Sequence, residues 1–459
     1  MSHPSTRLAE FAATLQHDAI PPTVRDAAAR SLLDILGVGI RGRQHAVAER
    51  GLAGARALSR GEGTAVVWGT GERLQTGAAA LANGIAAHVD DFDDTHGDAI
   101  VHGSAVIAPA VLALAVEQRA SGQDLLAAFI AGWEVAARIG LAARGTFHQR
   151  GFHTTSIAGV FGATAAAARL LGLNATQMTH ALGLAGSQAC GINEYLSNGS
   201  SSKTLHCGWS AQAGLVAATM AQAGMTGPTS VFEGRDGLLR AYGHPAQCDP
   251  AALDKDLGSS WEVTRISIKP YPCCHFAHAF IDCAGQLMAR GVGPDQIRSM
   301  DCVVHELQVP LVCEPVADKL APATPYIAKF SLPFLVAARM LDGRVDHDTF
   351  SMANLGREDI QAVARRVGYR VAAPGETRFP QTFPGRIEVT LTDGQRIEER
   401  LDVNLGHPDH PLSFEQVVAK FDDNTRLALG KNGAARVVDC VQRLSQIDAA
   451  TLAAALSPP

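Results

Sequence analysis

The segment His88–His102 (HVDDFDDTHGDAIVH) holds the densest group of reactive side chains in the chain. It carries five aspartates, three histidines and a threonine in fifteen residues, and alanine-rich apolar stretches flank it on both sides. So many titratable groups are costly to bury unless they are paired or hydrogen-bonded. We therefore expect this segment to move protons or to bind a charged ligand.

Helical spacing predicts which of these side chains meet. Residues three or four apart share one face of a helix, so a helix that frays after about Asp91 brings Asp91, Thr95 and His96 near one cavity. His102 follows a short loop, and Ser104 is suited to cap the next helix. Because imidazole titrates near neutral pH, we predict Asp91 and His102 as the proton-transfer pair.

Three other segments supply complementary groups, each expected in a loop or strand end ahead of a buried helix. They are GFHTT with His153, SSSKTLHCGW with Lys203 and His206, and IKPYPCCHFAH with Lys269, His275 and His278. Helix starts attract anions, and lysine ammonium groups suit carboxylates. The combination predicts a pocket for a small polyanion.

Such a pocket favours chemistry next to a carboxylate. Removing a proton there needs a positioned base and cations that stabilise the developing charge, a role open to Lys203 and Lys269. Protonation of a leaving hydroxyl completes a dehydration, and protonation of the opposite face completes an epimerisation. Loss of CO₂ in the same pocket is a decarboxylation. The residues alone leave these three reactions open.

Two other classes of protein compete with this interpretation. Asp and His also ligate Zn, Mn or Fe, so a metallohydrolase is one alternative, although no HExxH or His-x-His motif occurs. A carboxylate-binding homologue without activity is the other. The GxGxxG match at Gly37–Gly42 follows a helix and is interpreted as a helix end, and P-loop and GxSxG motifs are absent. We predict no metal and no organic cofactor.

Composition excludes several function classes. The chain has 459 residues, 47% hydrophobic and 18% charged, with a formal net charge of −6. No basic cluster indicates nucleic-acid binding, no apolar stretch predicts a membrane span, and the N-terminus lacks a secretory pattern. Nine scattered cysteines without a CxxC motif indicate buried thiols in a reducing compartment. We expect a cytoplasmic protein.

The length predicts two domains. The pattern of residues 1–260 predicts consecutive helices, including Thr76–Asp91, Gly122–Ala143 and Ser210–Ala223. Residues 261–404 read as an α+β domain with strands at Trp261–Lys269 and Met300–Leu307 and a hairpin over Gly385–Leu401. Helices within 405–459 are expected to pack back on the first domain. The predicted class is mainly α, with a smaller α+β domain.

Long motifs throughout the chain resemble the MmgE/PrpD family, which includes 2-methylcitrate dehydratase, cis-aconitate decarboxylase and iminodisuccinate epimerase. The matching stretches are HVDDFDDTHGDAIVHGSAVIAPA, GFHTTSIAGVFGATAAAARLLGL, LHCGWSAQAGLVAATMAQAGMTGP and SIKPYPCCHFAHAFID, with AKFSLPF, FPGRIEVTLTDG and GHPDHPLS further on. The resemblance implies a large all-helical domain, a smaller α+β lid domain, a site between them, a homodimer, and catalysis without metal or organic cofactor.

The resemblance also implies roles for individual residues. Asp91, His102 and His153 are expected to be catalytic, and Thr95, Lys203, Lys269 and His275 to bind a small di- or tricarboxylate. Two positions depart from the family pattern. Gly103 replaces a proline between His102 and Ser104, and His275 replaces an arginine after the cysteine pair. We expect a cofactor-independent lyase similar to 2-methylcitrate dehydratase, with a decarboxylase or an epimerase as the alternatives.

Overall fold

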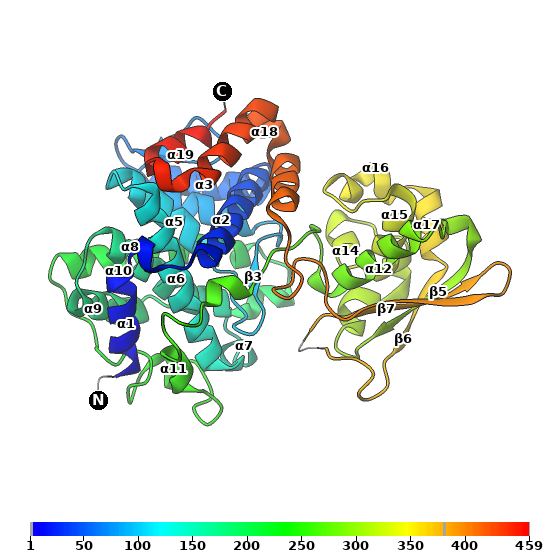
Figure 1. The fold of residues 1–459 in the computed structure, drawn as a ribbon, viewed down its shortest axis with the longest axis horizontal. Coiled ribbons are helices and arrows are strands. Elements are labelled where there is room, and N and C mark those ends of the chain that lie inside the picture. The colour runs from blue at the N-terminus through cyan, green and yellow to red at the C-terminus, as the bar shows by residue number, and fades with distance from the viewer. Residues whose placement is uncertain (1–2, 380–381, 459) are drawn as a thin grey trace. The chain divides into compact units, whose positions relative to one another are not determined.

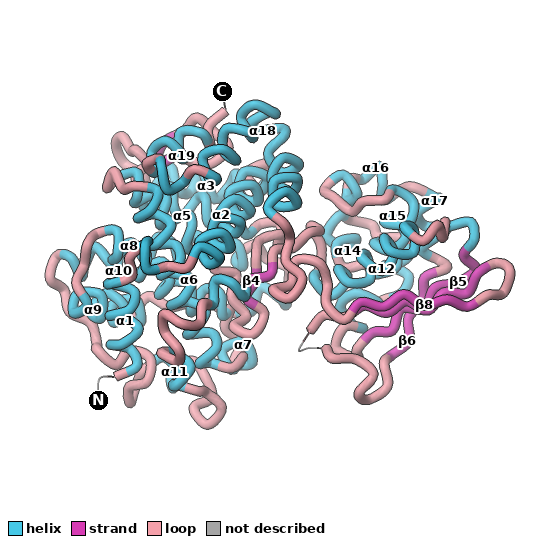
Figure 2. Tube along the Cα trace, viewed as in Figure 1, coloured by secondary structure: helices cyan, strands magenta, loops and turns pink. Residues whose placement is uncertain are grey.

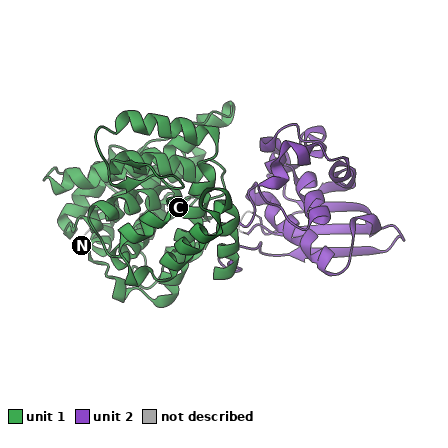
Figure 3. Ribbon diagram, turned by 90° about the horizontal axis from the view of Figure 1, so that it is seen from above, with its two compact units in different colours: residues 1–268, 413–459 green, residues 269–412 purple. Residues whose placement is uncertain are grey.

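The computed structural model describes residues 3–379 and 382–458 and divides the chain into two compact units (Figure 3). Residues 1–268 and 413–459 form the first, here called the helical unit, and residues 269–412 form the second, called the α+β unit. Helices dominate the first and the only extended sheet lies in the second, among the described residues (Figure 2). The predicted fold class is confirmed.

The helical unit is built on apolar helices that are buried on most sides. Its longer helices are α1 Pro4–Thr14, α2 Pro22–Gly42, α3 Ala46–Leu58, α4 Thr76–His88, α5 Ser104–Glu117, α6 Gly122–Ala143, α8 Thr154–Leu170, α9 Ala175–Gly186, α10 Ser202–Gln222, α18 Phe414–Gln442 and α19 Ala449–Ala455 (Figure 1). Helix α8 packs against α5, α6 and α10, and α18 packs against α2. Helices that are apolar all round need such burial.

A close crossing of α4 and α10 positions the chemistry. A Cβ atom on Gly84 would lie 2.7 Å from the Cα of Gly208, so only glycine allows this approach of the two helices. The crossing lies one turn from His88 at the end of α4 and about one turn from Lys203 and His206 near the start of α10. Small residues therefore bring reactive side chains from two distant segments together.

Helix α6 alone among the described residues is long and apolar enough to cross a membrane. Its most apolar window is 94% buried within the protein, as expected for a core helix. That no stretch spans a membrane stays a prediction, because α6 meets the criterion by length and composition alone and carries Asp124, Glu134 and Arg138.

Two helix boundaries near the reactive segments differ from expectation. Helix α4 ends at His88 instead of continuing to about Asp91, and Asp91 adopts a left-handed conformation with φ of 54°. Carboxylates oppose the negative end of the helix dipole, so the aspartates stop the helix. Helix α10 begins at Ser202, eight residues earlier than expected, since serines also favour helix starts. Lys203 and His206 therefore lie on a helix.

Part of the strand expected over Trp261–Lys269 is instead a 3₁₀ turn. Residues Glu262–Arg265 form that turn, and only Ile266–Ser267 (β4) are extended. Strand β4 pairs antiparallel with Thr95–His96 (β3), inside the reactive segment. The alternating pattern thus predicted the extended part alone.

The α+β unit contains a four-stranded sheet in the order β6-β5-β7-β8. Its strands are β5 Ile297–Val304, β6 Val367–Val371, β7 Gly385–Leu391 and β8 Arg396–Leu401. Strands β5 and β6 run parallel, and β7 and β8 form the expected hairpin. Helix α12 His278–Ala289 contacts β7, β8 and α15 Leu332–Asp342, and together they enclose an apolar core.

Candidate active site

Four histidines from separate segments gather in the helical unit. His88 ends α4, His102 lies two residues before α5, His153 precedes α8, and His206 is in the first turns of α10. The ring centroid of His88 lies 5.1 Å from that of His102 and 5.6 Å from that of His153. The ring centroids of His153 and His206 lie 5.3 Å apart. We call these four residues the histidine cluster.

Asp93 contacts this cluster directly. The Nδ1–H of His88 donates to Asp93 Oδ2 at 2.7 Å, and both side chains are fully buried. The same oxygen lies 3.5 Å from His102 Nδ1. One carboxylate oxygen of Asp91 also lies within 4.8 Å of a ring nitrogen of His102, so the proton-transfer role expected of Asp91 and His102 stays a prediction.

The ring of His102 is oriented by two oxygen atoms. Its Nδ1 lies 3.0 Å from the carbonyl oxygen of Asp94 and 3.0 Å from Thr95 Oγ1. Because a carbonyl oxygen only accepts, Nδ1 carries the proton in the neutral ring, and Nε2 keeps a lone pair. The side chain is 16% exposed, so a ligand can reach it. Thr95 acts on the ring of His102 in this arrangement.

The buried carboxyl group of Asp94 links the reactive segment to α2 and α5 through hydrogen bonds. Asp94 Oδ2 accepts hydrogen bonds from Ser31 Oγ at 2.9 Å and Ser104 Oγ at 2.5 Å. Burial, together with the nearby Asp34 and Asp93 carboxylates, raises the pKa of Asp94 to about 7 against the lowering effect of the hydrogen bonds from Ser104 and Ser31. Ser104 was expected to cap α5, but its hydroxyl group donates a hydrogen bond to Asp94 instead.

Gly103 packs against the indole ring of Trp133, which leaves no room for a side chain at position 103. It is the residue before α5, and a Cβ atom there would lie 2.7 Å from the indole ring of Trp133. The indole Nε1–H donates to Ser104 Oγ at 3.0 Å. The chain therefore has glycine at position 103, where the family pattern has proline, and the large side chain of Trp133 packs against this glycine.

Lys203 places a positive charge beside the cluster. Its Nζ lies 3.0 Å from Asp91 Oδ1, with the two side chains 27% and 40% exposed. Burial lowers the pKa of Lys203, but the neighbouring Asp91 carboxylate outweighs this and raises it overall. Lys203 is therefore a charged ammonium group, suited to hold a substrate carboxylate.

His153 and His206 form a pair of neutral rings. Their Nδ1 atoms lie 3.1 Å apart. Burial first, and then the neighbouring His88 and Lys203 side chains, lower the pKa of His206 to about 4 and that of His153 well below its ordinary value. At neutral pH one Nδ1 must donate the bridging proton and the other must accept it.

His96 lies away from the cluster, although it was expected there. Its Nε2 is 3.0 Å from Glu262 Oε2, and the ring is buried. Successive residues of a strand point to opposite faces, so β3 directs Thr95 towards His102 and His96 away from it.

Lys269 and His275 belong to the α+β unit. Lys269 is buried and is the first residue of that unit. His275 begins a 3₁₀ turn, and its Nε2 accepts a hydrogen bond from Asn404 Nδ2 at 3.1 Å. An arginine at this position would carry a permanent positive charge, which a histidine carries only when it is protonated. Their contact with substrate stays a prediction.

The same side chains could also hold a cation. One ligand atom from each of His88, Asp91, Asp93 and His102 lies within 4.8 Å of the others. The ligand atoms of a tetrahedral zinc ion lie about 3.3 Å apart, so these four atoms would have to move closer together to bind one. The ammonium group of Lys203 already supplies a positive charge at Asp91, and we interpret the group as proton-transfer machinery.

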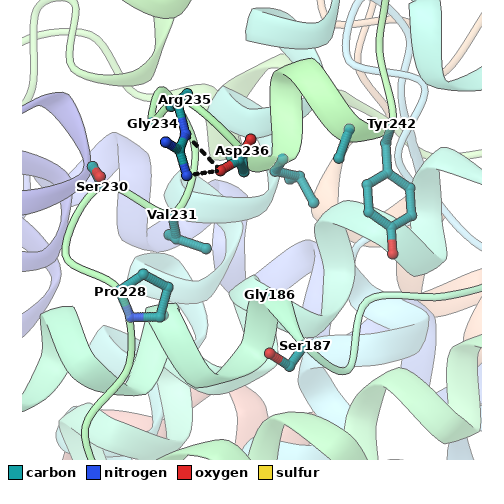
Figure 4. Close-up of a pocket in the computed structure, with 13 residues that line it drawn as sticks. Gly186, Ser187, Pro228, Ser230, Val231, Gly234, Arg235, Asp236 and Tyr242 are labelled. Atoms are coloured by element: carbon teal, nitrogen blue, oxygen red, sulfur yellow. Dashed lines mark hydrogen bonds and ion pairs between the residues drawn. The ribbon is translucent and has the colours of Figure 1, made fainter.

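A separate pocket of 610 Å³ lies in the helical unit (Figure 4). It is lined by the end of α9, including Gly186 and Ser187, and by residues between Pro228 and Tyr242. The Arg235–Asp236 ion pair stands at its edge, with both side chains largely exposed. No predicted site residue lines it, so it is distinct from the histidine cluster.

The structure brings together Asp91, Thr95, His102, His153 and Lys203, as expected for one site. Sequence reasoning did not assign roles to Asp93 and His88, and it placed His206 in a loop. The density of aspartates in DDFDD signalled that a carboxylate would matter, but not which one, because the backbone turn decides the direction of each side chain.

Comparison with known proteins agrees with the motifs. Residues 6–251 match the model of the MmgE/PrpD N-terminal domain, and residues 271–446 match that of the MmgE/PrpD C-terminal domain. The chain is 28% identical to a cis-aconitate decarboxylase of Mus musculus, covering 91% of this chain and 86% of the relative. It is 28% identical to one of Homo sapiens (94% and 90%) and 26% identical to one of Aspergillus terreus (91% and 88%).

Proposed function

The chain belongs to the MmgE/PrpD family, and on that premise we propose that it is a lyase acting on a small polycarboxylate, with cis-aconitate as the first substrate to test. The observation that carries the proposal is the arrangement around His102. Its Nδ1 is held by two oxygen atoms, and the ring lies beside the carboxylates of Asp91 and Asp93 and near the lysine ammonium group that pairs with Asp91.

The residues divide the work by their chemistry. Lys203 binds a substrate carboxylate and stabilises negative charge that develops near it. His102 exchanges a proton at Nε2, and Asp93 stabilises the ring when it becomes positively charged. Asp91 holds Lys203 in place. We propose that His153 supplies a second proton position and that Lys269 and His275 contribute further substrate contacts.

Decarboxylation is the reaction we favour within this class. All three relatives described above are cis-aconitate decarboxylases by name. In a decarboxylation the bond between carbon and a carboxylate breaks, CO₂ leaves, and the electron pair stays on carbon until a proton is added. The expected similarity to 2-methylcitrate dehydratase is less supported than the decarboxylase alternative, because the named relatives do not include a dehydratase.

Turnover of three substrates in D₂O tests the proposal. The enzyme is incubated with cis-aconitate, 2-methylcitrate and iminodisuccinate, and products are followed by NMR. Release of CO₂ with one deuterium on carbon identifies a decarboxylase, loss of water identifies a dehydratase, and deuterium exchange without net reaction identifies an epimerase. Absence of all three reactions contradicts the proposed lyase activity.

A variant of the central histidine tests the assigned role. His102→Gln removes the ring and is expected to lower kcat by about 10²–10⁴-fold while the Kd for a tricarboxylate stays within a few-fold. His180→Gln on α9 is the matched control, because His180 lies outside the histidine cluster and donates only to the Gly227 carbonyl. The homodimer and the cytoplasmic location stay predictions.

A further inference from the structure

A decarboxylation consumes one proton in each turnover. The carboxylate leaves as CO₂, so the carbon that carried it must receive a proton from outside the substrate. A dehydration, in contrast, releases one proton from carbon and uses one on the leaving hydroxyl. If the proposed function is correct, protons must reach a largely buried site repeatedly.

The histidine pair offers a path for that proton. His153 is only 6% exposed, whereas His206 is partly exposed on the first turns of α10. Their Nδ1 atoms lie 3.1 Å apart, a hydrogen-bond distance that forces the two rings to share a proton. Each ring keeps its Nε2 at the opposite end, where a second proton transfer can occur.

Neighbouring residues fix the positions of the His153 and His206 rings. Gly191 has φ of 120°, and a Cβ atom there would lie 2.8 Å from the Cβ of Ser156 and 3.3 Å from Cγ of His206. Its carbonyl oxygen accepts from the peptide N–H of His153 at 3.0 Å. The ring of Tyr195 lies 6.0 Å from that of His153 and 5.9 Å from that of His206. The backbone and an aromatic ring thus fix both imidazoles.

We propose that His206 is a positioning residue that relays protons from solvent to His153. His153 Nε2–H gives its proton to the substrate carbanion, and a C–H bond forms. His153 Nδ1 takes the bridging proton from His206 Nδ1, and His206 Nε2 takes one from water, which leaves a hydroxide ion in the solvent. Both rings are neutral before and after, and one solvent proton has been added to carbon. The rings regain their first tautomers by exchange with water after product leaves.

The neutral state of both rings fits this role. Burial and the positive charge of Lys203 disfavour a protonated ring at either position, and His88 and His102 face His153 from α4 and from the segment before α5. A proton that enters the pair is therefore passed on instead of being stored as a stable imidazolium.

The variant His206→Asn tests the relay. The Asn amide can still donate to His153 Nδ1, but it cannot pass a proton onward. We expect kcat to fall by about tenfold or more with KM changed by less than about threefold. In the natural enzyme several protons move in one step, so we expect a plot of kcat against the D₂O fraction to be curved. In His206→Asn we expect this plot to be linear. The matched control His180→Asn should keep the kcat and curvature of the natural enzyme.

Chemical rescue separates the relay from a structural role. Imidazole added to His206→Ala is expected to restore part of kcat, whereas it should not change His180→Ala. Natural kcat and isotope curvature in His206→Asn, or no rescue of a folded His206→Ala, would overturn the proposal.

The proposal rests on the proposed decarboxylation, so one measurement is independent of turnover. Nitrogen-15 NMR of the substrate-free protein reports which ring nitrogen carries the proton. In the natural protein the two imidazoles should share one bridging proton, and His206→Asn should shift the His153 nitrogens alone. If no substrate reacts but this coupling is seen, the decarboxylation fails while the proton-sharing pair stands. If the coupling is absent, the relay fails whatever the activity.

Discussion

Lys420 near the C-terminal end of the chain holds the backbone of Phe92 in the reactive segment. The Lys420 Nζ donates to the Phe92 carbonyl oxygen at 3.1 Å and lies 3.7 Å from the centroid of its ring. The same ammonium group lies 2.7 Å from Asp34 Oδ1 on α2, and both side chains are buried. Helices α2 and α18 therefore fix the loop that carries Asp93 to the histidine cluster.

This contact predicts separate effects on stability and catalysis. Lys420→Met leaves the Asp34 carboxylate buried without this cation, and the free energy of unfolding should fall by about 3–5 kcal/mol. The double variant Asp34→Asn/Lys420→Met should recover most of that stability, measured by urea denaturation. Because neither variant holds the Phe92 carbonyl, kcat should stay reduced in both. A double variant with natural kcat would show that Lys420 acts on stability alone.

Lys203 is predicted to matter for binding more than for stability. Lys203→Met should weaken binding of the unreactive tricarboxylate tricarballylate by about 10–100-fold, measured by calorimetry, because a charge-assisted contact is lost. The partly exposed pair with Asp91 should contribute at most about 1 kcal/mol to unfolding. Lys255→Met, at an exposed lysine of the same unit, is the control. Unchanged affinity in Lys203→Met contradicts the assignment.

The buried carboxyl group of Asp94 predicts how stability depends on pH. Its pKa is about 7 in the folded protein against an ordinary 3.8, so the unfolded chain loses this proton at lower pH than the folded one. The stability that protonated Asp94 contributes is complete below about pH 4 and is lost as pH rises to about 7. The loss from this group should be about 2–4 kcal/mol.

Asp94→Asn removes that titration. Its free energy of unfolding should fall less between pH 4 and 7 than that of the natural protein, as measured by urea denaturation at several pH values. Asp18→Asn, at a carboxylate that is 95% exposed, should keep the natural slope. Equal slopes for Asp94→Asn and the natural protein would show that Asp94 is ionised at lower pH than we state.

The contact between Gly103 and Trp133 predicts a strong coupling between the two positions. Gly103→Ala places a Cβ atom 2.7 Å from the indole ring and should destabilise the protein by about 1–3 kcal/mol. Trp133→Phe removes the far edge of the indole, so the double variant should lose less stability than the sum of the single variants. Thermal denaturation of all four proteins measures the coupling, and additive losses contradict the contact.

Chelation separates proton-transfer chemistry from metal chemistry at the cluster of His88, Asp91, Asp93 and His102. We expect protein dialysed against EDTA to keep its kcat within about twofold, because Lys203 already provides the positive charge that a carboxylate substrate needs. Elemental analysis of the same sample provides the control. Activity that is lost on dialysis and restored by Zn²⁺ or Mn²⁺ would support a metalloenzyme instead.

The residue types and motifs were sufficient to predict the helical class, the α+β part and the gathering of Asp91, His102, His153 and Lys203. The reason is that charged side chains between apolar helices must be paired, and helical periodicity is visible in a local stretch of chain. The hairpin over β7 and β8 was predictable for the same reason, since its alternation and turn residues are adjacent in the sequence.

Side-chain direction depended on packing between distant segments. Asp93 meets His102 because α4 ends at His88, and His96 turns away because β3 pairs with β4. His206 meets His153 because Gly214 lets α10 pack closely on Ala163 of α8, and Lys420 arrives from more than 300 residues away. These contacts depend on backbone angles and on helix crossings, which no local pattern of residue types encodes.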